Sequence, residues 1–83
     1  DLNINKINTL EINVFPNPAS NQILISTKQQ NCMLEITSLS GELMFKRKFD
    51  EKVSVSLNKF STGIYIIIVT VNNNRNYIKF VKN

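Results

Sequence analysis

The 83-residue chain holds few side chains that could perform catalysis or bind a metal ion. It has no histidine, the commonest general base and metal ligand, and its only cysteine is Cys32. A single cysteine excludes an internal disulfide and a CxxC site, and a cysteine without a histidine partner is a poor nucleophile. The six carboxylates do not follow the spacing of a calcium-binding loop. The sequence therefore predicts no enzyme activity, no metal and no cofactor, with Cys32 as a small buried hydrophobic residue.

Basic residues are concentrated in the second half of the chain, and the formal net charge is +4. Residues 44–83 carry eight Lys or Arg against two acidic residues, whereas residues 1–43 carry two against four. The segment Phe45-Lys46-Arg47-Lys48-Phe49 combines aromatic and basic residues. Proteins that bind single-stranded nucleic acid use such residues to stack on bases and to contact phosphates. A strand with one apolar and one solvated face explains the same pattern, with Arg47 tolerated on the apolar side at an edge strand or a bulge. The simpler interpretation is preferred, and no nucleic-acid partner is expected.

Composition and periodicity favour β-strands throughout. The chain has 22 β-branched residues against one alanine, and its 13 asparagines suit turns. The run at residues 64–71 is continuously apolar, so it is expected to be a central strand buried on both faces. Seven short strands without helical periodicity predict an all-β fold, a seven-stranded antiparallel immunoglobulin-like β-sandwich. The expected strands are residues 10–14, 22–27, 33–38, 43–49, 53–57, 64–71 and 77–82.

The length allows only one domain. Residues 1–9 are polar and Asn-rich and are expected to be a linker, whereas residues 10–83 form the domain. The chain starts at Asp1 and shows no signal-peptide pattern, which indicates a segment of a longer protein. No apolar run approaches the ~20 residues of a membrane helix, so no membrane span is expected. The oligomeric state is left open.

Four motifs occur in order along the chain. They are Val14-Phe15-Pro16-Asn17-Pro18-Ala19-Ser20, Ile36-Thr37-Ser38-Leu39-Ser40-Gly41-Glu42-Leu43, Val55-Ser56-Leu57 followed by Phe60-Ser61-Thr62-Gly63-Ile64-Tyr65, and Tyr77-Ile78-Lys79-Phe80-Val81-Lys82. Over residues 12–83 the set resembles the C-terminal sorting domain, type A, of proteins exported by the bacterial type IX (Por) secretion system. That family usually has Asp-x-x-Gly in the turn, where this chain has Ser38 three residues before Gly41.

The resemblance implies that the domain is a secretion signal for a larger cargo upstream in the same chain. Its implied partners are the type IX outer-membrane translocon, shuttle proteins and a cell-surface sortase-like cysteine peptidase that usually cuts just upstream of the domain. The implied route runs through the periplasm to the cell surface or the medium. The domain itself would be a substrate and a signal, without catalytic groups.

The last expected strand is the candidate recognition element. The resemblance places a required block there, and a strand that ends at the terminus can offer side chains and main-chain donors for strand addition. Ile78 and Phe80 are expected to face inward, with Lys79 and Lys82 projecting at or near the rim. The predicted recognition residues are Lys79, Phe80, Val81, Lys82 and Asn83. The motif residues expected to be mainly structural are Pro16, Asn17, Pro18, Gly41, Gly63 and Tyr65.

Two other functions fit the same fold: an immunoglobulin-like binding or adhesion module of a surface protein, and a passive spacer domain. A glycan-binding module generally needs an exposed aromatic platform, and here the phenylalanines and Tyr65 mostly fall on expected core faces. A spacer gives no reason for the family likeness to continue to the last residues. The secretion signal is therefore the preferred hypothesis.

Overall fold

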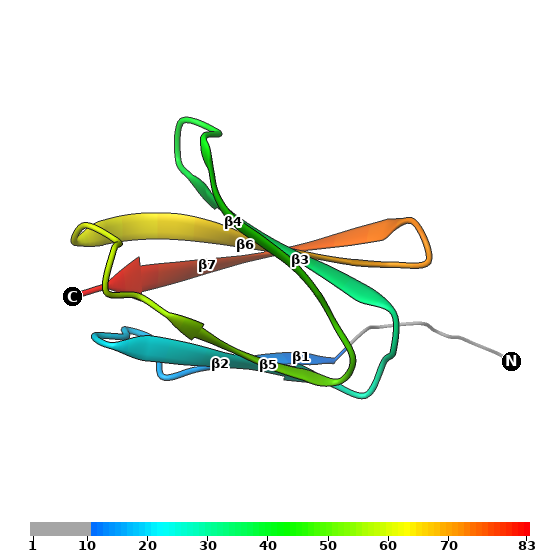
Figure 1. Cartoon of the computed structure of the whole chain (residues 1–83). Helices are drawn as coiled ribbons and strands as arrows, with labels where there is room; N and C mark the ends of the chain where they lie inside the picture. Colours follow the sequence, from blue (N-terminus) through cyan, green and yellow to red (C-terminus); the bar gives the residue numbers. More distant parts are fainter. Residues whose placement is uncertain (1–10) are drawn as a thin grey trace, which may run out of the picture.

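Two β-sheets packed face to face make up the described part of the chain, residues 11–83 of a computed structural model (Figure 1). The three-stranded sheet has the order β1 (Ile12–Phe15), β2 (Gln22–Thr27), β5 (Lys52–Ser56). The four-stranded sheet has the order β4 (Leu43–Phe49), β3 (Cys32–Ser38), β6 (Gly63–Val71), β7 (Asn74–Lys82). All five strand pairs within the sheets are antiparallel, which confirms the predicted seven-stranded immunoglobulin-like sandwich. The predicted linker, residues 1–9, lies outside the described residues.

In residues 11–83 no helix is long and apolar enough to cross a membrane.

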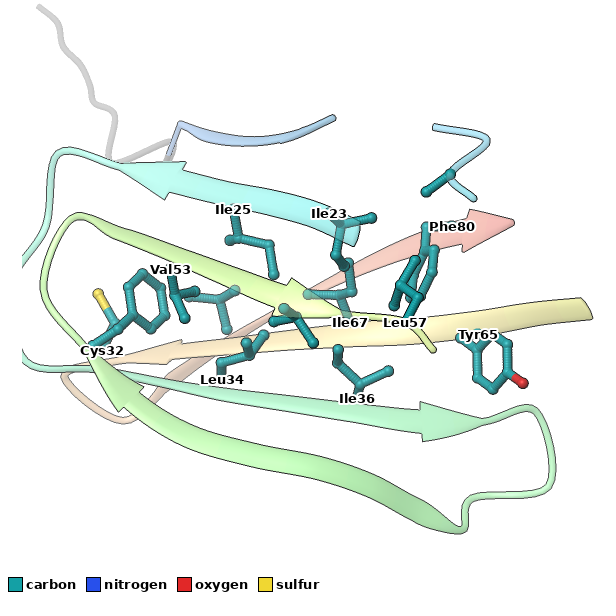
Figure 2. Packing of buried hydrophobic residues seen from close by; sticks show 14 of the residues in the cluster. Ile23, Ile25, Cys32, Leu34, Ile36, Val53, Leu57, Tyr65, Ile67 and Phe80 are labelled. Atoms are coloured by element: carbon teal, nitrogen blue, oxygen red, sulfur yellow. The ribbon is translucent and has the colours of Figure 1, made fainter. Parts of the chain in front are cut away.

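The hydrophobic core lies between the two sheets (Figure 2). Side chains alternate between the two faces of a strand, so every second residue of each strand points into this space. Full burial of an aliphatic or aromatic side chain contributes about 1.5–3 kcal/mol. The largest side chains that are completely shielded from solvent are Ile23, Ile25, Leu34, Ile36, Leu57, Ile67 and Phe80.

Strand β6 is an inner strand of its sheet, but only one of its faces lies in the core. Ile67 and Val69 are fully buried between the sheets. Ile64 points the other way and is 41% exposed, and Ile66 on the same side is half-buried. Ile68 is shielded by its neighbours yet does not belong to the core cluster. The expectation that β6 is buried on both faces was wrong because, among the described residues, no third layer covers the outer side of this sheet.

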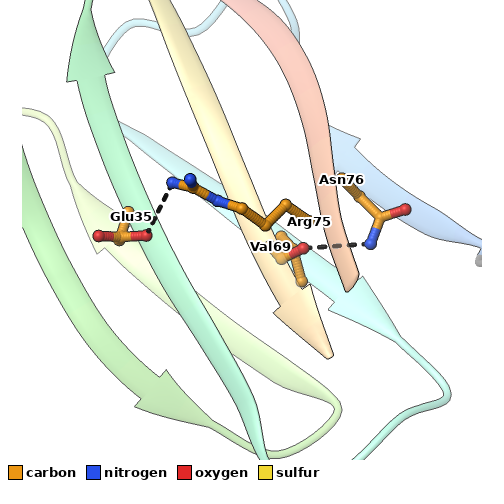
Figure 3. A network of polar contacts seen from close by, with 4 residues as sticks. All are labelled: Glu35, Val69, Arg75 and Asn76. Carbon is orange, nitrogen blue, oxygen red and sulfur yellow. Dashed lines mark hydrogen bonds and ion pairs between the residues drawn. The ribbon is translucent and has the colours of Figure 1, made fainter. Parts of the chain in front are cut away.

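Strand β7 begins three residues earlier than expected. Asn72 and Asn73 alone make the turn after β6, with φ of 51° and 69°. Asparagine tolerates this left-handed backbone, so two residues suffice to reverse the chain. Residues 74–76, expected in the turn, therefore extend the strand, and Asn76 Nδ2 donates a hydrogen bond to the Val69 carbonyl at 3.1 Å (Figure 3).

Strand β4 is an edge strand with a bulge, the two conditions under which Arg47 was expected on the apolar side. Its register with β3 shifts between Ile36 and Thr37, and the Arg47 side chain is exposed. Phe45 packs against the core and Phe49 belongs to it. The two rings thus lie on the opposite side of the strand from its lysines, so the segment does not present the alternating aromatic and basic surface that nucleobases would need.

Candidate functional site

The Pro16-Asn17-Pro18 corner lies against the end of β7. Strand β1 ends at Phe15, and the following prolines cannot donate to a sheet ladder. The peptide bonds before both prolines are cis. After the corner, Ala19 forms a parallel bridge with Lys82. The chain therefore leaves one sheet at β1 and contacts the other at the end of β7.

Four hydrogen bonds join this corner to the outer edge of β7. Asn17 Nδ2 donates to the Lys79 carbonyl at 3.1 Å, and the Val81 N–H donates to Asn17 Oδ1 at 3.1 Å. The Ala19 N–H donates to the Val81 carbonyl, and the Asn83 N–H donates to the Ala19 carbonyl, both at 2.8 Å. The side chain of Asn17 thus takes the place that the backbone of a neighbouring strand would occupy. We call this contact of Asn17 and Ala19 with residues 79–83 the corner–strand junction.

The junction corrects the expectation of free main-chain donors in residues 79–83. The N–H groups of Val81 and Asn83 are already bonded within the domain. A receptor could add a strand to this stretch only if it displaced Asn17 and Ala19. Recognition of the intact domain at residues 79–83 must therefore use side chains.

The side chains of residues 79–82 point in different directions. Phe80 is completely buried, and its ring stacks on that of Tyr65 with centroids 5.5 Å apart. Lys79 is exposed on the outer side of the four-stranded sheet, beside Ile66. Lys82 is half-buried on the opposite side of the strand, because residues three apart in a strand face opposite ways. The two lysines were expected to project together at the rim, but they do not form one charged surface.

Gly63 and Tyr65 belong to a motif that supports the end of β7 from the core. Gly63 has a φ of 155°, a conformation that a side chain would strain, and it pairs with Lys82. The Tyr65 hydroxyl donates to the Ser61 carbonyl at 2.7 Å, the tyrosine-corner arrangement of immunoglobulin-like sandwiches. The Phe60 ring packs against the core and meets the Tyr65 ring edge-on, with the ring centroids 5.1 Å apart. Because Tyr65 also stacks on Phe80, this motif supports the end of β7 from the core side.

Gly41 lies in the turn between β3 and β4, outside the junction. Its φ is 94°, which favours glycine, and its N–H donates to the Ser38 carbonyl at 3.0 Å. The Ser38 hydroxyl accepts a hydrogen bond from the Glu42 N–H at 3.1 Å. Ser38 thus supplies the side-chain acceptor at the position where the resemblance would place Asp, and the turn forms without an aspartate.

Cys32 lies at the start of β3 and is buried. Burial raises the pKa of its thiol, and the nearby Asp50 carboxylate raises it further, while a backbone hydrogen bond at Glu51 partly offsets both. A thiol that stays protonated is a weak nucleophile, so the geometry offers no catalytic role for Cys32. Among residues 11–83, no three Cys, Asp or Glu side chains gather where they could hold a metal ion.

The chain matches known proteins in sequence and in fold. Over 78 residues it is 37% identical to an endo-acting ulvan lyase of Formosa agariphila, a match that covers 90% of this chain and 15% of that protein. Its fold matches, with a TM-score of 0.78 and 20% identity, a structure of PorZ, described as an essential bacterial surface component of the type IX secretion system of Porphyromonas gingivalis. That match covers 87% of this chain and 11% of PorZ.

A family model described as the secretion system C-terminal sorting domain matches residues 13–83. This range contains the corner, the tyrosine-corner motif and the whole of β7. The chain therefore belongs to the family of type IX C-terminal sorting domains, the signals that direct secreted proteins to the cell surface or the medium.

Proposed function

We propose that the domain is recognised in the periplasm, by the type IX outer-membrane translocon or a shuttle protein, at the end of β7 and the adjoining corner. The observation that carries this proposal is the pair of Asn17 hydrogen bonds to Lys79 and Val81. They bring together two family motifs that are more than 60 residues apart and fix the strand in one position. Of the proposed recognition residues, Lys79 and Asn83 are exposed and Val81 and Lys82 are half-buried.

Phe80 contributes to recognition indirectly in this proposal. Its side chain is completely buried against Tyr65, so it cannot touch a receptor in the folded domain. Its role is to hold β7 against the core, so that the neighbouring side chains have a fixed place.

The domain acts as a signal attached to a cargo and catalyses nothing itself. The chain spans 15% of the ulvan lyase that it matches, and we propose that the two proteins share only the sorting domain. We further propose that a sortase-like cysteine peptidase cuts within or just upstream of residues 1–9 and that the cargo is then anchored at the surface or released. The cleaved peptide bond would lie upstream of the domain, which would supply no group to the reaction.

The test is an export assay of the full protein carrying Lys79→Ala and Lys82→Ala together. Neither side chain belongs to the core cluster, and such substitutions usually change stability by less than about 0.5 kcal/mol. We expect the cargo to accumulate in the periplasm while the domain still melts cooperatively. Lys28→Ala with Lys59→Ala removes two exposed lysines outside the four-stranded sheet and should leave export normal.

Normal export of the Lys79 and Lys82 double variant would place the recognised surface elsewhere on the sandwich. Deletion of residues 77–83 would not answer the question, because it removes Phe80 from the core and the domain would unfold.

A further inference from the structure

The outer face of the four-stranded sheet has an unusual composition for a solvent-facing surface. An antiparallel sheet with one face on the core normally has polar residues on the other. The strand register places fourteen side chains on this face, because residues opposite one another in a ladder point the same way. They are Met33, Glu35 and Thr37 of β3; Leu43, Lys46 and Lys48 of β4; Ile64, Ile66, Ile68 and Thr70 of β6; and Arg75, Tyr77, Lys79 and Val81 of β7.

An apolar stripe runs along the middle of this face. Its axis is the outward row of β6, where Ile64, Ile66 and Ile68 follow one another. Tyr77 lies beside Ile68 on β7, and Leu43 lies at the β4 side. Six large hydrophobic side chains are exposed in residues 11–83, and three of them, Leu43, Ile64 and Tyr77, lie on this one face. Clustered exposed apolar residues with a polar border indicate an interaction surface.

Cationic residues border the stripe on both sides. Lys46 and Lys48 lie along the edge strand β4, and Lys79 lies on the edge strand β7, whose Arg75 side chain packs over Tyr77 and turns inward over the sheet. The only carboxylate among the fourteen side chains is Glu35, 3.7 Å from the Arg75 guanidinium, which reaches it across β6 (Figure 3). The face therefore has a positive charge on each side, and its complement is an acidic surface.

The distance between the lysines of β4 and Lys79 of β7 indicates the shape of the partner. Neighbouring strands are about 4.8 Å apart, so β4 and β7 are separated by about 14 Å. An α-helix with its side chains is about 10–12 Å wide, so a helix centred between β3 and β6, in contact with Ile64 and Ile66, would fit between these charges. A flat layer of lipid headgroups gives no reason for positive charge on both edges with an apolar stripe between them, and a second copy of this face would be repelled by its like charge. Strand addition at residues 79–83 is opposed by Asn17 and Ala19, which already occupy that edge.

We propose that this face binds an amphipathic helix of the export machinery, with apolar residues against Ile64 and Ile66 and acidic residues on both flanks. The proposal rests on the proposed function, since the helix would belong to a protein that recognises the sorting domain. It adds a second contact to that function, because Lys46 and Lys48 are on the far side of the sheet from β7. Lys79 is shared by the two surfaces.

The test is photo-crosslinking in cells that export the full-length protein. Tyr77, which is 61% exposed, is replaced by p-benzoylphenylalanine, and a second strain carries the same group at Ser54 on β5 of the other sheet. Adducts are mapped by mass spectrometry, and export is followed in parallel. We expect the Tyr77 position to crosslink to a protein segment with acidic residues on both sides of an apolar helical stripe. Lys46→Gln with Lys48→Gln should lower this adduct about tenfold, the effect of losing two favourable charge contacts.

Matched control variants separate the effects of charge and apolar contact on this face from a general loss of stability. Lys28→Gln with Lys59→Gln makes the same charge change outside this face and should leave the adduct within about twofold of wild type, as expected for distant sites. Ile64→Asn should lower the adduct, whereas Leu39→Asn, an exposed residue of the β3–β4 turn, should not.

The outcomes also separate this proposal from the proposed function. Normal export without a Tyr77 adduct would overturn the docking surface and leave the sorting role intact. An adduct with lipid, lipopolysaccharide, a second copy of the chain or a segment without acidic flanks would overturn it as well. If Lys79→Ala with Lys82→Ala exports normally but the acidic adduct still depends on Lys46 and Lys48, the docking surface stands and the recognition role of residues 79–83 falls.

Discussion

The side-chain carboxamide oxygen of Asn17 accepts a hydrogen bond at 3.1 Å from the backbone N–H of Val81, 64 residues further along the chain. The amide nitrogen of the same side chain donates to the carbonyl of Lys79. One residue thereby satisfies a donor and an acceptor on the outer edge of β7, which protects that edge from pairing with another chain. Because Asn17 lies two residues after the end of β1, unpairing of β1 would also loosen the end of β7.

Replacement of Asn17 by Ala should destabilise the domain by about 1–2 kcal/mol, because two hydrogen bonds are lost and each contributes about 0.5–1.5 kcal/mol. Equilibrium unfolding in urea measures this change. Asn58→Ala is the matched control, since Asn58 is exposed in the β5–β6 connection. The free energy of unfolding of this variant should stay within about 0.5 kcal/mol of wild type. Equal stability of both variants would show that the junction does not hold β7.

Two neighbouring isoleucines of β6 should respond differently to truncation. Ile67 is completely buried in the core, so Ile67→Ala should cost about 2–5 kcal/mol. Ile66 points to the outer face and is half-buried, so Ile66→Ala should cost about 1 kcal/mol, within the range of ordinary substitutions. Chemical denaturation of the two variants measures both changes in the free energy of unfolding. A larger loss at Ile66 than at Ile67 would contradict the orientation of β6.

The isoleucines of β6 also show where the sequence was informative. Alternation in β2 and β4 predicted the bounds of both strands, because each has one face on the core and one in solvent. In β6 there is no alternation of apolar and polar residues, since Ile64, Ile66 and Ile68 make the outer face as apolar as the inner one. A continuous apolar run can mean burial on both faces or an exposed apolar stripe, and only the layers around it distinguish the two.

The junction could not be predicted from spacing. Proline and asparagine at residues 16–18 indicated a corner, but not that the Asn17 side chain would reach β7. That contact depends on the packing of the two sheets, which brings residues from opposite ends of the chain together. The separation of Lys79 from Lys82, in contrast, follows from the two-residue period of a strand and could have been read from their numbers.

The thiol of Cys32 should react slowly in the folded domain. Desolvation raises its pKa above the ordinary value of 9.0, so little thiolate is present at pH 8. Alkylation by iodoacetamide at this pH should be at least about tenfold slower than in urea, because reactivity follows thiolate content and exposure. Comparable rates in both conditions would contradict the burial of Cys32.

The same pKa shift makes stability depend on pH. A folded-state pKa above the unfolded value means that the folded domain binds the proton more tightly, so the contribution is complete below about pH 9. It is lost as pH rises through the folded value. The free energy of unfolding should therefore fall more steeply above pH 9 for the wild type than for Cys32→Ala, which lacks the thiol. Parallel pH profiles in urea denaturation would contradict the shift.

The two lysines of the terminal block should contribute unequally to export. Lys79 is exposed and stands on the same face as Ile66, whereas Lys82 lies half-buried on the other side of β7 beside Ala19. A receptor that approaches one face can use only one of the two charges. We expect Lys79→Ala alone to reproduce most of the export defect of the double variant, and Lys82→Ala alone to export nearly as well as wild type. Secreted and periplasmic cargo, quantified in the two single variants, provides the measurement. A defect confined to Lys82→Ala would contradict this expectation and show that the receptor contacts the opposite side of β7 from Lys79, and equal defects would require a receptor that encloses the edge of β7 from both faces.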